Sequence, residues 1–163
     1  MKATAADEAA VLQAVALAQS EQLGPDVPVG ALVLDSSAEV LASATNRRVR
    51  DADPTAHAEV VALRAAAAVS DSWRLNGCTL VVSLEPCPMC AGAAVNARVA
   101  RIIFGAWNPD YGACGSVWDL PRDKRITHRP EVVGGIQVAA ARAPLDTFFA
   151  RRRGADAAQD ETW

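Results

Sequence analysis

The chain has 163 residues, and 51% of its side chains are apolar, which is enough for one buried core. Its net charge of −3 does not suggest a nucleic-acid binder. Its acidic start lacks a signal-peptide pattern and no apolar run is long enough to cross a membrane, so we expect a soluble, cytoplasmic protein. We expect one domain over residues 1–153 and a polar, disordered tail over residues 154–163.

The first half of the chain alternates helical and extended patterns. Thr4 and Asp7 form a capping-box pattern, which predicts a helix that Gly24-Pro25 stops. Residues 29–34 are almost continuously apolar, as in a strand buried on both faces, and residues 39–45 predict its hairpin partner. Thr55 is the predicted N-cap of a helix that runs to about residue 69.

The second half continues the alternation. Residues 78–84 and 101–105 predict buried strands, and Pro88 suits the first position of a helix that ends near residue 98. Further segments follow: an irregular stretch over 106–130, a short strand at 132–133 and a helix over 137–153. We therefore predict an α/β fold, a three-layer α/β/α sandwich around a central mixed sheet of about five strands.

Four residues carry the chemistry of this sequence. His57 and Glu59 lie about thirty residues before Cys87 and Cys90, and the His-x-Glu … Pro-Cys-x-x-Cys spacing is the signature of zinc-dependent base deaminases. A catalytic zinc site uses three protein ligands and keeps one position for water, which predicts His57, Cys87 and Cys90 as the ligands of Zn²⁺. Cys87 as N-cap and Cys90 three residues later share one side of a helix end that favours thiolates.

Glu59 is the predicted general acid and base. It accepts a proton from water, delivers it to the ring nitrogen and protonates the leaving ammonia. His57 and Glu59 lie about 200° apart around an ideal helix, so both serve one centre only where the helix presents its N-terminus to the metal. The predicted reaction is hydrolytic removal of an amino group from a nucleobase.

Other interpretations of the cysteines stay open at this point. With Cys114 or His128 as a fourth ligand, the zinc site would be closed and would only support the fold. A redox pair or two disulfides are further alternatives, although metal binding is the better interpretation of Cys-x-x-Cys in a chain of this kind. Cys78 begins an apolar strand and is expected to be a small buried hydrophobic residue.

From about Val11 to Arg153 the chain resembles the bacterial tRNA-specific adenosine deaminases (TadA) of the cytidine-deaminase-like superfamily. The resemblance rests on these segments: Val27-Pro-Val-Gly-Ala31, Asn46, Asp53-Pro-Thr-Ala-His-Ala-Glu59, Leu84-Glu-Pro-Cys-Pro-Met-Cys-Ala-Gly-Ala93, Phe104-Gly-Ala106 and Gly112-Ala-Cys-Gly-Ser116. It implies a homodimer with one zinc per subunit that converts adenosine to inosine at the wobble position of the tRNA anticodon stem-loop, with Glu59 as proton shuttle.

The resemblance also implies substrate contacts. Asn46 and the backbone at Ala58 would hold the flipped base, and Asn108, Phe149 and Arg153 would contact the RNA; Asn46 can also be read as a turn residue alone. Asn108 departs from the family, which usually has Asp there to accept a hydrogen bond from the ribose 2′-OH. We therefore predict a weaker preference for RNA over DNA than in relatives.

Charge and aromatic residues bear on the substrate. Residues 122–153 carry a net charge of +5 and the remainder carries −8, so the C-terminal third is expected to face phosphates, although Arg151–Arg153 also suit a solvated helix end. Five aromatic residues are candidates for base stacking: Trp73, Trp107, Tyr111, Phe148 and Phe149. For Trp73 and Phe148, a core or dimer contact is the alternative. The competing functions are a deaminase of free guanine, cytosine or their nucleosides, and a non-catalytic zinc or RNA-binding module.

Overall fold

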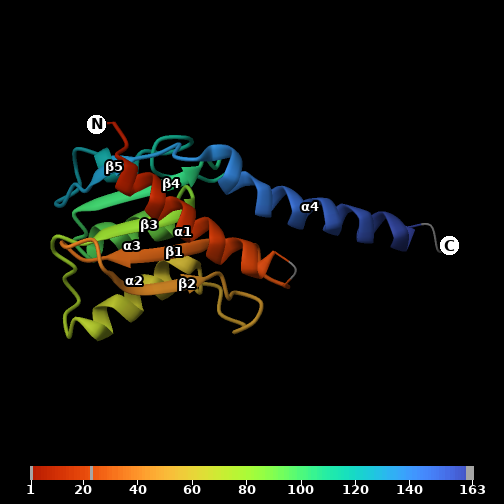
Figure 1. Ribbon diagram of the computed structural model, residues 1–163, viewed down its shortest axis with the longest axis horizontal. Helices are drawn as coiled ribbons and strands as arrows, with labels where there is room; N and C mark the ends of the chain where they lie inside the picture. The colour runs from red at the N-terminus through yellow and green to blue at the C-terminus, as the bar shows by residue number, and fades with distance from the viewer. Residues whose placement is uncertain (1, 23, 161–163) are drawn as a thin grey trace.

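A mixed sheet of five strands lies at the centre of the protein (Figure 1). The computed structural model describes the backbone of residues 2–22 and 24–160 and the side chains of these residues as far as Gly154. The strands are β1 (Gly30–Leu34), β2 (Val40–Thr45), β3 (Thr79–Leu84), β4 (Arg101–Ala106) and β5 (Glu131–Val133). They follow the order β2-β1-β3-β4-β5; β1 is antiparallel to β2 and β3, whereas β3, β4 and β5 are parallel.

Two helices cover each face of the sheet. The helices are α1 (Ala5–Glu21), α2 (Ala58–Val69), α3 (Pro88–Asn96) and α4 (Val138–Asp160). Alternate side chains of β3 point to opposite faces: Leu80 and Val82 pack in the core under α2 and α3, and Val81 packs in the core under α1 and α4. The predicted three-layer α/β/α sandwich with a mixed five-stranded sheet is confirmed.

The middle strands of the sheet are buried on both faces. Every residue of β1 is buried, which explains its continuous apolar sequence, whereas the edge strand β2 is only partly buried. Helix α1 lies so close to β1 that a Cβ atom at Gly30 would come within 2.2 Å of the Ala14 carbonyl oxygen. Glycine at this position therefore permits the close approach of helix and strand.

The two helices that lead into the site begin differently from each other. Cys87 is the N-cap of α3 and Pro88 its first residue, as predicted. The prediction that Thr55 caps α2 is wrong, because His57 is the N-cap and the helix begins at Ala58. The Thr55 amide and hydroxyl donate instead to the Asp53 carboxylate, both at 2.7 Å, so a local turn occupies the groups that a cap would use.

Helix α4 continues to Asp160, beyond the predicted end at Arg153. Figure 1 shows it extending away from the sheet. The predicted polar tail thus begins inside this helix; residues 161–163 lie outside the described residues, and disorder of the tail stays a prediction. Residues 155–158 include three alanines, the strongest helix former, which accounts for the longer helix. Among the described residues, no helix has the length and hydropathy needed to span a membrane.

Candidate metal centre and substrate cavity

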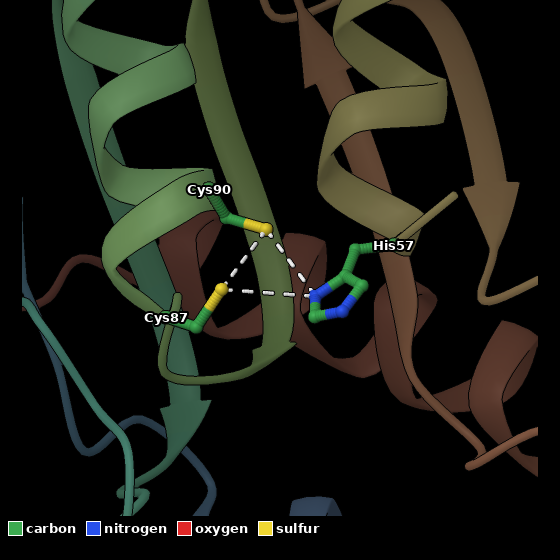
Figure 2. Close-up of side chains that lie close together, drawn as sticks. All are labelled: His57, Cys87 and Cys90. Atoms are coloured by element: carbon green, nitrogen blue, oxygen red, sulfur yellow. Dashed lines mark hydrogen bonds between the residues drawn. The ribbon is translucent and has the colours of Figure 1, made fainter. Parts of the chain in front are cut away.

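His57, Cys87 and Cys90 converge where the N-termini of α2 and α3 meet beyond the carboxyl end of β3 (Figure 2). The two Sγ atoms are 3.5 Å apart, and the Nδ1 atom of His57 lies 3.7 Å from Cys87 Sγ and 3.5 Å from Cys90 Sγ. In a tetrahedral zinc site with ordinary bond lengths, two sulfur ligands are about 3.8 Å apart and a sulfur and a nitrogen about 3.6 Å. The three ligand atoms therefore fit a zinc ion.

The predicted fourth ligands of a closed site are not in position. Within the described residues the cluster of mutually close ligand atoms has three members, and neither Cys114 nor His128 belongs to it. His128 Nε2 lies 2.6 Å from the Val99 carbonyl oxygen, and Cys114 is buried in the core. All four cysteines are free thiols, and Cys78 is buried as expected. The arrangement is that of an open site with three protein ligands.

The electrostatics of the cluster favour anionic sulfur. His57 and Cys87 are themselves the N-caps of α2 and α3, so both helices direct their positive ends at the cluster. The hydrogen bond between the two sulfur atoms lowers the pKa of Cys87 to about 4 and raises the pKa of Cys90. The hydrogen bond to Cys87 also raises the pKa of His57.

Glu59 lies in the first turn of α2 and lines the same cavity as two of the cluster residues, His57 and Cys87. Its side chain is buried, and burial raises its pKa because the charged form is desolvated. None of the ion pairs among the described residues includes this carboxylate. A buried acid with no cationic partner beside a metal site has the surroundings of a general acid and base.

A cavity of about 130 Å³ opens onto the metal cluster, and three predicted substrate residues, Asn46, Ala58 and Asn108, line it. Asn46 is also a turn residue: its Nδ2 donates to the Val27 carbonyl oxygen at 3.1 Å, and its Oδ1 accepts the Arg48 amide at 3.4 Å. Asn46 is thus a turn residue that also lies in the cavity wall, and its contact with a base stays a prediction.

A larger groove of about 430 Å³ adjoins the cavity, and Phe149 and Arg153 line it. The two spaces have three lining residues in common: Val27, Leu84 and Asn108. All five predicted substrate residues therefore lie in the cavity or in the groove, with Asn108 at the junction.

The arginines at residues 151–153 divide between two roles. Arg151 and Arg152 donate to the carbonyl oxygens of Gln22 and Pro25 at 3.3 and 2.7 Å, which ties α4 to the segment after α1. Arg153 lines the groove instead. The basic end of the helix is thus partly structural and partly available to a ligand.

The aromatic residues also divide. Phe148 is buried, so the core interpretation holds for it. Trp107, Tyr111 and Phe149 are exposed and line the cavity or the groove. Each ring also makes an edge-to-face contact with a second aromatic ring of the protein, and base stacking on them stays a prediction. Trp73 is exposed elsewhere, in a shallow apolar hollow over α2 and α3.

Sequence reasoning missed the role of Glu85. Its buried carboxylate accepts three backbone N–H groups, from Asn108 at 3.0 Å, Cys114 at 2.9 Å and Ser116 at 3.0 Å, and so holds the loop that forms one side of the cavity. A Cβ atom at Gly112 would lie 2.2 Å from this carboxylate. The available signal was a charged residue directly after a predicted buried strand, because a buried carboxylate requires several donors.

Comparison with known proteins identifies related sequences. Residues 4–106 match the family described as the cytidine and deoxycytidylate deaminase zinc-binding region. A tRNA-specific adenosine deaminase of Bacillus subtilis is 39% identical over 147 residues, which cover 90% of this chain and 91% of that protein. A tRNA(Ile)-lysidine synthase of Deinococcus deserti is 48% identical over 142 residues, or 86% of this chain. The chain spans only 26% of that relative's length.

Solved structures of two kinds share the fold. One, from a study of A-to-I editing by tRNA:A34 deaminases at the wobble position of transfer RNA, superposes with a TM-score of 0.77 at 35% identity and covers 81% of this chain and 95% of its own. Another, a guanine deaminase from Nitrosomonas europaea, has a TM-score of 0.76 at 30% identity and covers 91% of this chain and 87% of its own.

Proposed function

The chain belongs to the zinc-binding family of cytidine and deoxycytidylate deaminases, and from this membership we propose that it hydrolyses adenosine to inosine at the wobble position of the tRNA anticodon. The observation that carries the proposal is the triad His57, Cys87 and Cys90 beside the buried Glu59, in a chain 39% identical over most of its length to a tRNA-specific adenosine deaminase. The adjoining groove with its exposed aromatic and basic residues supports a substrate larger than a free base.

Each site residue has a proposed role. His57, Cys87 and Cys90 hold zinc, which when bound supplies a Lewis acid that acidifies water. Glu59 accepts one proton of the attacking water and delivers it to the purine ring nitrogen, where it stays. It then takes the proton of the hydroxyl group added to the ring carbon and delivers it to the amine, which leaves as ammonia. Its burial suits this task because desolvation raises the pKa of the carboxyl and so makes its carboxylate a stronger base.

The proposed substrate contacts divide between the cavity and the groove. Asn46 and the Ala58 backbone hold the adenine base in the cavity, while Asn108, Phe149 and Arg153 contact neighbouring parts of the RNA. Stacking on Phe149 and charge attraction by Arg153 suit splayed single-stranded nucleotides. The anticodon stem-loop of tRNA presents such nucleotides, and we place the reaction in the cytoplasm.

The protein is proposed to act as a homodimer of single-domain subunits. Trp73 and Val69 are 59% and 67% exposed, and Trp73 lines the apolar hollow formed with residues of α2 and α3. A second copy that covers this hollow would bury apolar surface that is otherwise left in water. The metal cluster lies at the N-termini of α2 and α3, so the two helices that position the ligands would also form this interface.

Deamination of free guanine is the second candidate. It is favoured by the similarity in fold to the guanine deaminase from Nitrosomonas europaea and by the small size of the cavity. The groove beside the cavity favours the RNA substrate, since a free base does not need it.

One assay separates the two functions. The zinc-loaded protein is incubated with an anticodon stem-loop that carries adenosine at the wobble position and, separately, with free adenosine, guanine and cytosine. We expect inosine in the stem-loop and no turnover of the free compounds. Turnover of guanine with none of the stem-loop would reject the tRNA function in favour of the second candidate, and no turnover at all would reject both.

A further inference from the structure

The wall of the substrate cavity contains one Lys or Arg residue, Arg48. The other ionisable groups in the wall include two buried carboxylates, Glu59 and Glu85, and the histidine of the metal cluster. Glu85 is satisfied by backbone amides. Apart from the groups of the metal cluster, Arg48 is therefore the side chain of this wall that offers a positive charge to a polyanionic substrate.

Arg48 differs from the two other arginines of its loop. Arg47 pairs with Asp51 at 3.0 Å and Arg50 pairs with Glu21, so their charges are used within the protein. The guanidinium of Arg48 has no ion pair and no hydrogen bond among the residues that the structure describes. It is exposed at the cavity and available to a ligand.

The backbone that carries Arg48 is held on several sides. Its amide donates to Asn46 Oδ1 at 3.4 Å, and its carbonyl oxygen accepts the Asp53 amide at 3.2 Å. The next two amides, of Val49 and Arg50, donate at 2.6 and 3.1 Å to the carboxylate of Asp26, which is buried. The loop therefore presents the Arg48 side chain beside the base-binding wall without a large cost in backbone ordering.

The chemistry of the guanidinium selects its ligand. Arginine offers a planar fork of donors that matches a phosphate, and it remains charged at all physiological pH values. A base that enters the cavity toward His57 and Glu59 leaves its ribose and flanking phosphates at the mouth, where the exposed Arg48 lies. A free base has no group of this kind.

We propose that Arg48 binds a phosphate flanking the target adenosine and so favours a nucleotide within a chain over a free nucleoside. This inference rests on the proposed function. It adds a second basic contact to the one proposed for Arg153: Arg153 lines the groove, whereas Arg48 lines the cavity that takes the base.

The experiment uses the zinc-loaded protein and an anticodon stem-loop with adenosine at the wobble position. Arg48→Ala should lower kcat/KM about ten-fold, mainly through KM, because one charge-assisted phosphate contact is lost. Arg48→Lys should restore part of the loss, and Arg47→Ala is the matched control that should change little. Replacing one charged contact should also reduce the slope of log KM against log salt by about one.

A neutral methylphosphonate placed 5′ or 3′ of the target nucleotide identifies the contact. At the linkage whose phosphate Arg48 binds, the neutral substitution should lower the kcat/KM of the wild-type protein about ten-fold. It should not lower the kcat/KM of Arg48→Ala any further. The inference is wrong, while the tRNA function stands, if Arg48→Ala keeps the same kcat/KM as Arg47→Ala. It is also wrong if each of the two neutral linkages lowers the kcat/KM of Arg48→Ala as much as that of the wild type. If the wild-type protein neither binds nor deaminates the stem-loop, both are wrong.

Discussion

The two ends of the sheet handle buried acidic groups in opposite ways. At the amino end of β4, Arg101 pairs with Asp7 and with Glu131, each at 2.9 Å. At the carboxyl end of β3, Glu59 and Glu85 are equally buried, yet no ion pair among the described residues includes either of them. The acids near Arg101 are neutralised by an arginine, and we call this the balanced end. The acids near the metal cluster have no such partner among the described residues, and we call this the unbalanced end.

This difference separates stability from function. The hydrogen bond with Arg101 lowers the pKa of Asp7, so this carboxylate favours the folded state at neutral pH. Burial raises the pKa of Glu59, so its charged form opposes folding at the same pH. A protein keeps such an uncompensated acid where a reaction needs it, and the unbalanced end is the end with the metal cluster.

The largest effect is expected at Glu59. Glu59→Gln should lower kcat about 10³-fold, because proton transfer to and from the purine is lost. It should leave zinc content and the free energy of unfolding unchanged or slightly improved, since the variant buries no charge. Steady-state kinetics, metal analysis and urea unfolding measure the three quantities. Glu39→Gln, an exposed residue of the opposite end, is the control. Loss of zinc in Glu59→Gln would identify Glu59 as a ligand and refute its role.

A smaller effect is expected at Glu85, whose charge is spread over three backbone amides. In Glu85→Gln an amide group that donates would face amides that also donate, and the free energy of unfolding should fall by about 3 kcal/mol. Hydrogen exchange at Asn108 and Cys114 should become faster. The surface pair of Asp123 and Arg125 provides the control, since Asp123→Asn should leave the free energy of unfolding nearly unchanged. Equal stabilities of the two variants would contradict the assigned role of Glu85.

At the balanced end, Asp7→Asn should destabilise the protein by about 2 kcal/mol at pH 7, because its charged bond to Arg101 is lost. The pKa of Asp7 is lowered in the folded state, so its contribution is present above the unfolded value of about 3.9 and disappears as the pH falls below it. The difference between variant and wild type in urea unfolding should therefore shrink from pH 7 to pH 2.

The activity of Asp7→Asn tests the separation of the two ends. Its kcat/KM at 25 °C should match that of the wild type, because the residue lies at the opposite end of the sheet from the metal cluster. A stability difference that stays constant down to pH 2 would show that Asp7 acts through the helix cap at Thr4 and not through its charge.

Sequence alone predicted the parts of the site that local rules determine. Pro88 after Cys87 marks a helix start, which places Cys87 and Cys90 together on that helix end. The same type of rule failed at Thr55, since Asp53 two residues earlier competes for its hydroxyl and amide. Both rules involve residues within one turn of chain. Where a helix begins depends on which neighbour forms a hydrogen bond with the candidate cap residue.

Contacts between distant segments account for what sequence reasoning missed. The partners of Glu85 begin 23 residues later, and no local pattern links them. Nothing in the sequence distinguishes Arg48 from Arg47 and Arg50. The fold places an acidic partner beside each of those two and none, among the described residues, beside Arg48. The length of α4 was a different error, because the alanine content beyond Arg153 is a local signal.

The smallest predicted effect concerns Asn108, at the junction of cavity and groove. Its Oδ1 accepts the Tyr111 amide at 3.1 Å, and its Nδ2 group, a donor, makes no hydrogen bond among the described residues. An aspartate at this position would keep that bond with one oxygen and offer the other, charged, to a ribose 2′-OH. Asn108→Asp should therefore raise the ratio of kcat/KM on an RNA hairpin to that on the matched DNA hairpin, by about five-fold.

Asp110→Asn separates this contact from a general change of charge. Asp110 lines the same groove, so its neutralisation should affect RNA and DNA alike through their phosphates and leave the ratio unchanged. Because DNA lacks the 2′-OH, a charged acceptor in place of Asn108 would be left without a donor in the DNA complex, and the wild-type chain avoids that penalty. Strict dependence of the wild type on RNA, with no change of the ratio in Asn108→Asp, would show that Asn108 does not meet the ribose.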